Sequence, residues 1–581
     1  MQHALNMQCN FPADCQNILE DQEFSADLQF EAAAPWPLLL FNTKHLQSKR
    51  YPQQEAENLV NHWLDENSRH ITLIGICSYY LFNELVNQLD KNCTLTLIEK
   101  DPKLLKSFLS ALNITKTPET QPSIKFICHS DEEELCLNFR KELSANPKMC
   151  DALFIAPACE RLRWDLKQLR ERLRIEVRLE AMDRITVASF ADEWLQNSLI
   201  NLPEISQSCG IQSLYGQFKD RDALIICAGP SLNDSLECIK QLQNRYLIIV
   251  VGTALKPCLK AGIKPHLTIV LDSDPKVFKQ FMNITDLPGY LIASYNVFPA
   301  IFQLYGKRLF PFNSNISNDF ARWLEQAGIK HGELHVGGTV SLSAIDSARR
   351  LGCRNLMIFG LDLCFSEDGT SHAANTMYED QKIIQGLVRV KGNKVKTVGT
   401  TGQFASYIEI INAYLLQVFS DFKGKTINVN KSGAFIKGLQ LMSPEEFSGL
   451  KHQPEIDLHQ RIEELSQKPD CRIDAHFQQT INTMKQIACE GKALLEQLQG
   501  SKIPQGLEEY ENKVQNDSFC SQLLSPALKA WCMSIENNET DPLTMTRSFL
   551  SQVQGCAEWI SGLLELSQQR YKQITEGVSH G

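Results

Sequence analysis

The chain has 581 residues, 43% of them hydrophobic and 22% charged, which is ordinary for a folded protein but too long for a single core. A formal net charge of −10 without a long Lys/Arg block argues against a surface for nucleic acid or anionic lipid, although it leaves room for a local basic pocket. The 19 cysteines are scattered without any Cys-x-x-Cys pair, which favours reduced thiols over a disulfide framework or a structural zinc site.

Residues 1–65 are expected to form a partly exposed lead-in segment. Its first residues lack a basic region followed by an apolar one, so no secretory signal is predicted. The apolar run from Trp36 to Phe41 is too short to cross a bilayer, and no other run is long enough. These features predict a cytoplasmic protein without a membrane span.

Residues 66–204 predict an N-terminal Rossmann-like α/β domain. A strand, a small-residue turn, a helix and a second strand that ends in acidic residues follow one another, a pattern found in dinucleotide-binding domains. The turn keeps one glycine, Gly75, and places Cys77 and Tyr79 where a ligand requires bare backbone. We therefore expect a scaffold with a degraded site, and the question of whether it binds a ligand stays open. The expected strands are 71–75 and 93–98, and the expected helix between them is 81–89.

Residues 205–440 predict the central domain, a Rossmann-like parallel sheet. Three apolar runs rich in β-branched residues each stop at small or acidic residues, as strands do when they end at a binding crevice. A glycine-containing turn at 335–340 leads into a predicted helix over 341–351. The expected strands are 223–227, 247–251, 267–271, 291–294, 308–310, 355–359 and 426–429.

Residues 445–581 predict a C-terminal helical domain. Apolar residues recur at spacings of three and four over 455–498 and 543–575, and strand-forming residues are few. This periodicity is typical of a bundle or of antiparallel helices.

The first loop of the central domain predicts a phosphate site. Gly229 follows a strand directly, Pro230 suits the first turn of a helix, Ser231 supplies a hydroxyl, and Leu232 continues the helix. Backbone amides at such a helix start attract phosphate. The alternative is a tight strand–helix turn without a ligand. The loop is not a P-loop, because no Gly-Lys-Ser/Thr follows.

Two carboxylates, Asp272 and Asp274, follow the third strand of the core. Such a pair can hold a divalent cation or bind sugar hydroxyls. The alternative is that Asp274 caps a helix that begins at Pro275. Thr253 and Asn296 end neighbouring predicted strands and join the list of candidate donor-binding residues.

Two further turns follow the same pattern. Gly337, Gly338 and Thr339 precede a predicted helix and suggest a second site for phosphate, sugar or base. Gly360 and Asp362 end another buried strand. Gly337, Gly338, Thr339 and Gly360 are candidates for donor binding, and Asp362 is a candidate for catalysis.

His372 lies in a polar loop that contains glycine, where we expect it to be mobile and accessible to solvent. A histidine in such a place can serve as a general acid or base near neutral pH. The alternative is an ordinary surface histidine. No sequence pattern of a serine hydrolase or of a zinc protease is present.

Seven short motifs resemble, in the same order, those of the motility accessory factor (Maf) family. The resemblance is dense between about residues 205 and 440, and the layout of the flanking domains is similar. It implies a cytoplasmic O-glycosyltransferase that moves a nonulosonic acid, pseudaminic or legionaminic acid, from a CMP-activated donor to Ser/Thr of flagellin. The motifs are 226–232, 271–275, 337–339, 360–362, 370–372, 397–407 and 432–438.

The core is also similar to small bacterial sialyltransferases that use CMP-sialic acid. Two departures matter: the cytidine-binding asparagine of those enzymes falls at Ala228, and their catalytic histidine lies well beyond the strand that matches Gly360. His372 is therefore only a candidate base, with Glu379 and Asp380 as rivals. Because CMP leaves as a monophosphate, Mg²⁺ is possible but not required.

Two alternatives remain. The same core family includes a 6-hydroxymethylpterin diphosphokinase, which would use ATP and Mg²⁺ with Asp272 and Asp274 as metal ligands. A non-catalytic flagellin-binding factor is the second alternative. The sequence leaves open which sugar is transferred, the acceptor sites and the oligomeric state.

Overall fold

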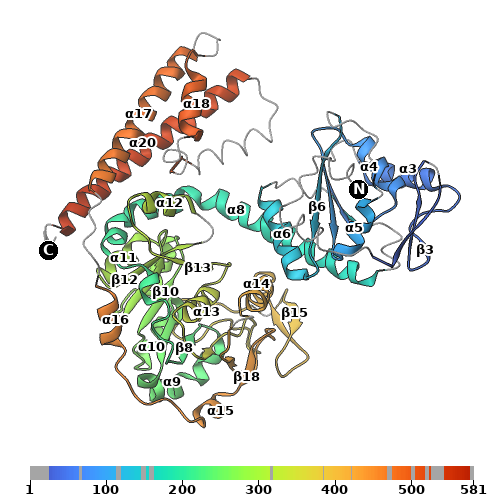
Figure 1. Cartoon of the computed structure of the whole chain (residues 1–581). Coiled ribbons are helices and arrows are strands. Elements are labelled where there is room, and N and C mark those ends of the chain that lie inside the picture. The colour runs from blue at the N-terminus through green and yellow to red at the C-terminus, as the bar shows by residue number, and fades with distance from the viewer. Residues whose placement is uncertain are drawn as a thin grey trace. The chain divides into compact units, whose positions relative to one another are not determined.

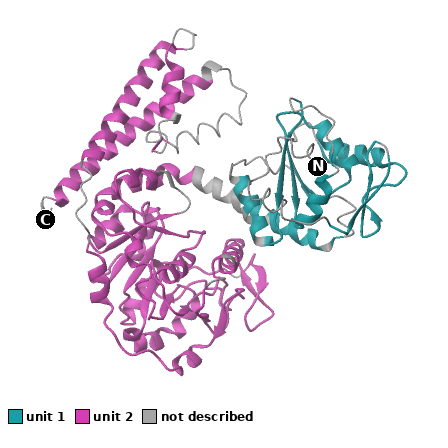
Figure 2. Cartoon of the chain, in the orientation of Figure 1, with its two compact units in different colours: residues 1–186 teal, residues 187–581 magenta. Residues whose placement is uncertain are grey.

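The structure is a computed structural model, which groups the chain into two compact units, residues 1–186 and residues 187–581 (Figure 2). It describes residues 25–33, 35–64, 69–110, 112, 120–145, 152–155, 163–314, 318–383, 385–419, 422–467, 474–498, 504–516, 523–524 and 542–575.

The N-terminal unit is built on a four-stranded parallel sheet in the order β6-β5-β4-β7. Helices α4 (Tyr79–Gln88), α5 (Pro102–Ser110) and α6 (Glu132–Ala145) connect its strands. A small antiparallel sheet, β1-β2-β3, and helix α3 (Pro52–Trp63) precede it. The strands are β1 (Leu28–Glu31), β2 (Leu38–Phe41), β3 (Lys44–His45), β4 (His70–Ile74), β5 (Thr94–Glu99), β6 (Ser123–Cys128) and β7 (Ala152–Ile155).

The second unit contains a nine-stranded sheet in the order β13-β12-β11-β10-β9-β8-β14-β17-β18, and every neighbouring pair is parallel (Figure 1). Its central strands are apolar and buried on both faces, as a parallel sheet covered by helices requires. The strands are β8 (Ala223–Ile226), β9 (Leu247–Val251), β10 (Leu267–Val270), β11 (Tyr290–Ser294), β12 (Leu309–Ser314), β13 (Glu333–Leu334), β14 (Leu356–Phe359), β17 (Thr426–Val429) and β18 (Gln440–Met442).

The order of this sheet reverses between β8 and β14. The chain moves outward from β8 through β13 on one side and then returns to the other side of β8 with β14. At such a reversal the loops that leave two neighbouring strands diverge and open a crevice at their carboxyl ends.

The helices of this part of the chain are α9 (Leu236–Leu242), α10 (Gly252–Lys260), α11 (Pro299–Tyr305), α12 (Asn318–Gln326), α13 (Val340–Arg350), α14 (Gly402–Val418), α15 (Pro444–Ser448) and α16 (His459–Leu465).

Helix α8 (Trp164–Gln207) runs from the first unit into the second. Beyond α16, helices α17 (Asp474–Gln497), α18 (Leu507–Asn516) and α20 (Pro542–Thr575) form the C-terminal part, where α17 and α20 run alongside each other (Figure 1). The side chain of Arg570 on α20 pairs with Glu204 near the end of α8.

The predicted fold class is confirmed: the chain is α/β, with a parallel-sheet core, a Rossmann-like N-terminal part and helices at the C-terminal end. The expected domain boundaries at 65/66, 204/205 and 440/445 stay predictions. Within the ranges that the structure describes, no helix has both the length and the apolar character needed to span a membrane.

Candidate active site

The predicted site residues gather at one edge of the nine-stranded sheet. Because all its strands are parallel, the segments that follow β8, β9, β10, β11 and β14 leave from the same edge. These segments carry Gly229, Thr253, Asp272, Asn296 and Asp362, in that order. The topology thus brings together residues that are up to 133 positions apart in the sequence.

The turn after β8 is filled by a carboxylate of the protein itself. The backbone N–H of Ser231 donates to Oδ2 of Asp362 at 2.8 Å, and the N–H of Gly229 donates to the carbonyl of Gly360 at 2.8 Å. A Cβ at position 229 would lie 2.3 Å from Oδ2 of Asp362. Glycine is therefore required here for the contact with Asp362, and the role of Gly229 in donor binding stays a prediction. The following helix, η2 (Pro230–Asp234), has only five residues.

Asp362 is buried, with 4% of its surface exposed. Asn430 donates to its other carboxylate oxygen. Desolvation by burial raises the pKa of Asp362, and the hydrogen bonds from Ser231 and Asn430 oppose that rise. This environment suits a residue that joins β8 to β14 better than one that touches a substrate. Its catalytic role stays a prediction.

The carboxylates of Asp272 and Asp274 have different surroundings. Asp274 is the N-cap of helix η4 (Pro275–Gln280), where its Oδ1 accepts the N–H of Lys276 at 2.7 Å. This hydrogen bond, together with the ammonium of Lys276, lowers the pKa of Asp274. The capping alternative therefore describes Asp274.

Asp272 is exposed, yet desolvation by surrounding protein raises the pKa of its carboxyl, and the charge of Asp274 adds to the rise. With Asp274 engaged in its cap, the two carboxylates fit a resident Mg²⁺ poorly. Among the residues that the structure describes, no cluster of three or more His, Cys, Asp or Glu is suited to hold a metal ion.

Four aromatic side chains form a wall, and two of them, Tyr378 and Tyr407, lie near Asp272. We define this aromatic wall as His372, Tyr378, Phe404 and Tyr407. The ring centroids of His372 and Tyr378 are 4.7 Å apart, those of His372 and Phe404 are 6.4 Å apart, and those of Phe404 and Tyr407 are 6.1 Å apart. Burial raises the pKa of both tyrosines, and the charge of Asp272 contributes to each rise, which places both phenols near that carboxylate.

His372 is half-buried and held in place, contrary to the expectation of a mobile, accessible side chain. The hydroxyl of Ser371 lies 2.8 Å from Nδ1 of His372, and the next residue, Ala373, donates its N–H to the carbonyl of Ala228 at 2.8 Å. The loop is thus fastened to the turn after β8. Burial lowers the pKa of His372 to about 4, so its imidazole is neutral at physiological pH.

The glycine turn before α13 lies against the same wall. Gly338 has φ +71°, and a Cβ there would be 3.1 Å from Cε1 of Tyr407. Thr339 is the N-cap of α13 and accepts the N–H of Ser341 at 3.4 Å. A helix of eleven residues, α13, thus starts beside the aromatic wall. The sequence predicts this helix, over residues 341–351, but not its place beside the wall.

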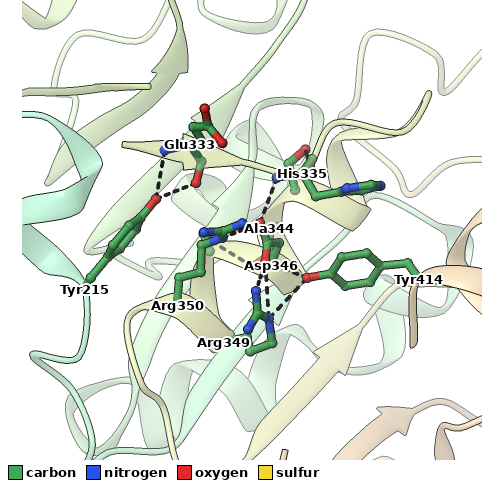
Figure 3. A network of polar contacts seen from close by, with 10 residues as sticks. Tyr215, Glu333, His335, Ala344, Asp346, Arg349, Arg350 and Tyr414 are labelled. Atoms are coloured by element: carbon green, nitrogen blue, oxygen red, sulfur yellow. Dashed lines mark hydrogen bonds and ion pairs between the residues drawn. The ribbon is translucent and has the colours of Figure 1, made fainter. Parts of the chain in front are cut away.

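A network of ion pairs and hydrogen bonds around the buried Asp346 fixes the segment that leads into this turn (Figure 3). Asp346 of α13, with no exposed side-chain surface, accepts the N–H of His335 at 2.7 Å and pairs with Arg349 and Arg350 at 2.9 Å each. The hydroxyl of Tyr414 donates to it at 2.5 Å. Burial alone would raise the pKa of Asp346, but these partners lower it. Asp346 stays charged and fixes the start of the glycine turn.

Thr253 and Asn296, two other predicted donor-binding residues, have partners within the protein. The amide of Gln280 donates to the hydroxyl of Thr253 at 3.0 Å. Oδ1 of Asn296 accepts the hydroxyl of Ser294 at 2.5 Å. Both side chains stay predicted donor-binding residues, and each would have to exchange or share its present hydrogen bond with a ligand.

Three residues of α8 that were not predicted from the sequence donate hydrogen bonds to the segments that follow β10 and β11. Asn197 donates to the carbonyls of Ser273 and Asn296 at 3.1 Å each, and Asn201 donates to those of Tyr295 and Val297 at 2.9 and 2.7 Å. The indole of Trp194 donates to the hydroxyl of Ser273 at 3.2 Å. Their spacing of three and four residues places them on one face of a helix, and this spacing is the signal in the sequence that could have indicated them.

A cavity of about 670 Å³ adjoins the wall on the side of Met377 and Glu379, a volume typical of ligand pockets. Lysines of α10 and of the following turn also line it, and Asp272 and His372 are not part of its lining. The cavity is thus distinct from the surroundings of Asp272, although Met377 and Glu379 flank Tyr378 of the wall in the sequence.

The fold and this edge define the class: a Rossmann-type α/β protein whose crevice lies at a topological switch point, the place where such proteins bind nucleotides. Two comparisons with known proteins agree with that class. A family described as 6-hydroxymethylpterin diphosphokinase MptE-like matches residues 196–368, less than half of the chain. A solved structure of the MAf glycosyltransferase from Magnetospirillum magneticum AMB-1 covers 96% of this chain and 94% of its own, with a TM-score of 0.55 and 14% identity.

These comparisons confirm the expected likeness to the Maf family in fold, and the likeness to the diphosphokinase over the core. A protein of Treponema pallidum (strain Nichols), described as uncharacterized, is 25% identical over 195 residues. The match spans about a third of that relative, since it covers 34% of its length and 33% of this chain.

Proposed function

We propose that the protein is a glycosyltransferase that moves a nonulosonic acid from a CMP-activated donor to a Ser or Thr hydroxyl of flagellin. The observation that carries the proposal is the exposed carboxylate of Asp272, close to Tyr378 and Tyr407 of the aromatic wall, at the switch point of the sheet. The shared fold with a Maf glycosyltransferase supports the reaction class. The motifs of the sequence support the donor and the acceptor.

The start of α13 is the better place for the leaving phosphate. The N–H of Ser231 in the turn after β8 already has Asp362 as its acceptor, whereas α13 is a full helix whose dipole points toward the wall. Partial positive charge at a helix start stabilises a phosphate that gains charge as its bond to the sugar breaks. Asp272, near the two tyrosines of the wall, is suited to accept hydrogen bonds from sugar or ribose hydroxyls.

The reaction is then a direct displacement. The oxygen of the acceptor hydroxyl attacks the anomeric carbon, the bond from that carbon to the phosphate oxygen breaks, and CMP leaves with the electron pair. The proton of the hydroxyl passes to His372. Nε2 accepts this proton in the tautomer whose Nδ1 carries the hydrogen and donates it to the hydroxyl of Ser371.

Intact-mass spectrometry of flagellin tests the proposal. In a strain that lacks the gene, we expect flagellin without the mass of a nonulosonic acid, restored by the wild-type gene but not by Asp272→Asn or His372→Ala. Purified protein should bind CMP with the same affinity with and without EDTA. Unmodified flagellin in the parent strain would contradict the assignment of donor and acceptor.

The match to a diphosphokinase family favours one second candidate, phosphoryl transfer from ATP with Mg²⁺. It predicts ATP binding that disappears with EDTA and with Asp272→Asn. The two functions therefore separate in one titration series with CMP and ATP, each with and without chelator. A flagellin-binding factor without catalysis would instead leave glycosylation unchanged in His372→Ala.

A further inference from the structure

A β-hairpin beside the aromatic wall presents an unpaired cationic surface. Its strands are β15 (Val388–Lys391) and β16 (Thr397–Thr400), paired antiparallel. The register sets Val390 opposite Val398, and both pack against a small core of Cys364, Ile408 and Ala434. Because successive side chains of a strand alternate between faces, Arg389 and Lys391 belong to the opposite face.

The local charge contrasts with that of the chain. Residues 381–408 contain five basic residues and no Asp or Glu, whereas the whole chain has a net charge of −10. We call Arg389, Lys391, Lys394 and Lys396 the hairpin cations, and all four are exposed. Among the residues described by the structure, no carboxylate lies within ion-pair distance of any of them.

Apolar side chains are interspersed with these cations. Val388 and Val395 are 45% and 55% exposed. The ammonium of Lys391 lies 3.8 Å from the ring centroid of Phe435, which is 36% exposed. A surface that combines unpaired cations with exposed apolar groups suits a partner with acidic and apolar side chains.

The hairpin is joined directly to the candidate active site. It lies next to α14 (Figure 1), and β16 leads through Thr401, the N-cap, into that helix, whose first two turns carry Phe404 and Tyr407 of the aromatic wall. The N–H of Phe365 donates to the carbonyl of Gly399 at 2.9 Å, which ties the hairpin to the segment that leads to His372. A polypeptide bound on the hairpin would therefore lie beside the wall.

We propose that the hairpin cations dock an acidic stretch of the polypeptide acceptor and so present its hydroxyl residue to the site. The inference rests on the proposed function only in taking the acceptor to be a protein. A polypeptide fits better than a lipid surface, because the neighbouring chemistry needs a single hydroxyl side chain delivered to the wall. Charge complementarity mainly speeds encounter and selects partners, so the interaction should weaken as salt rises.

A matched pair of triple variants of the full chain tests the docking. The first is Arg389→Gln/Lys394→Gln/Lys396→Gln, which spares Lys391 and its contact with Phe435. The second is Lys307→Gln/Lys330→Gln/Lys423→Gln, three exposed lysines that precede β12, β13 and β17 at the opposite edge of the sheet. Both remove three positive charges from the protein.

The probe is a fluorescein-labelled peptide of alternating Glu and Ser, followed by anisotropy. The hairpin variant should bind it about five- to tenfold more weakly than wild type, as the loss of three exposed ion pairs predicts, and the control should change by less than about twofold. Equal affinities of the two variants would overturn the proposal. So would binding to phosphatidylserine vesicles that depends on the hairpin cations when binding to the peptide does not.

A separate measurement keeps this inference distinct from the proposed function. CMP binding should be the same in wild type and in the hairpin variant, since the cations are outside the donor site. If wild type binds no CMP, the proposed donor is wrong while the peptide result still stands. If CMP binds normally and both triple variants modify flagellin with equal kcat/KM, the docking surface is wrong and the transferase survives.

Discussion

In each of the two larger parallel sheets of this chain, a carboxylate of the protein accepts a backbone N–H from the turn that follows the sheet's first strand in the sequence. The two carboxylates differ in their partners. In the N-terminal unit, the N–H of Ile76, after Gly75 at the end of β4, donates to Glu99 at 3.1 Å. In the second unit, the N–H of Ser231 donates to Asp362 at 2.8 Å. Both turns therefore have a carboxylate of the protein where a ligand phosphate binds in nucleotide-binding relatives of this architecture.

The partners of the two carboxylates differ. Arg163 lies 2.8 Å from both oxygens of Glu99, and both side chains are buried. Among the residues that the structure describes, the partners of Asp362 are uncharged: the Ser231 N–H and the Asn430 amide. A closed ion pair makes the first turn purely structural, whereas the second turn holds a carboxyl whose charge is not balanced locally. The second turn belongs to the edge that carries the exposed carboxylate of Asp272 and the aromatic wall.

Arg163→Ala should have the largest effect, because it leaves Glu99 buried without a cation. We expect the N-terminal unit to lose about 3–5 kcal/mol of unfolding free energy. Urea denaturation followed by circular dichroism measures it. Lys49→Ala, which breaks an exposed pair with Glu31, should cost less than about 1 kcal/mol. Equal losses for the two variants would mean that the Glu99 pair is not what closes the first turn.

Gly229→Ala should destabilise the second unit by about 1–3 kcal/mol, because the added methyl group overlaps Asp362 and the carbonyl of Gly360. It should also abolish the proposed transfer, since the turn carries the loop of His372. Gly562→Ala is the control: its Cβ would meet nothing within 4 Å, and alanine should stabilise helix α20 by about 0.5–1 kcal/mol. Thermal unfolding and CMP release separate the two effects.

Asp362→Asn should make stability less dependent on pH. The folded state raises the pKa of Asp362, so it holds the proton more tightly than the unfolded state. Stability from this group is complete below the ordinary Asp pKa and is lost as pH rises through the raised value. Asparagine keeps an oxygen for the Ser231 N–H without the charge, but its amide nitrogen meets the amide donor of Asn430, which costs the same at every pH. The difference in unfolding free energy between variant and wild type, measured at pH 4, 5.5 and 7, should therefore shift in favour of the variant as pH rises.

The pH profile of transfer should show the smallest change, a displaced acid limb. If His372 is the base, kcat/KM should fall only near pH 4, since burial lowers its pKa to about 4 from an ordinary value near 6.5. Desolvation also raises the pKa of Asp272, whose titration can add to the acid limb, so the limb must be compared with that of His372→Gln. A limb near pH 6.5 in wild type would mean that another histidine supplies the base.

The local sequence pattern correctly predicted the strands whose carboxyl ends form the candidate site. The apolar runs before Gly229, Asp272 and Gly360 are strands, because runs of β-branched residues of this length fit a sheet buried on both faces. The capping alternative for Asp274 was also visible in the sequence, since Asp before Pro is a frequent helix start.

Long-range pairing could not be predicted. Asp362 reaches Ser231 across 131 residues, and nothing in the local sequence distinguishes a carboxylate that meets a ligand from one that meets a backbone amide. Helix α8 was missed because the sequence of its 44 residues shows no single apolar stripe at helical spacing. Phe404 and Tyr407 resemble core residues of an apolar helix, so their place in the wall follows only from the fold.

The continuity of α8 has a practical consequence for dissecting this protein. Trp194, Asn197 and Asn201 belong by contact to the second unit, although they precede the boundary that the sequence suggests at 204/205. A fragment that starts at 205 would lack the amides that fasten the ends of β10 and β11. A fragment that starts at 187 would keep them, so limited proteolysis and expression trials have a defined place to cut.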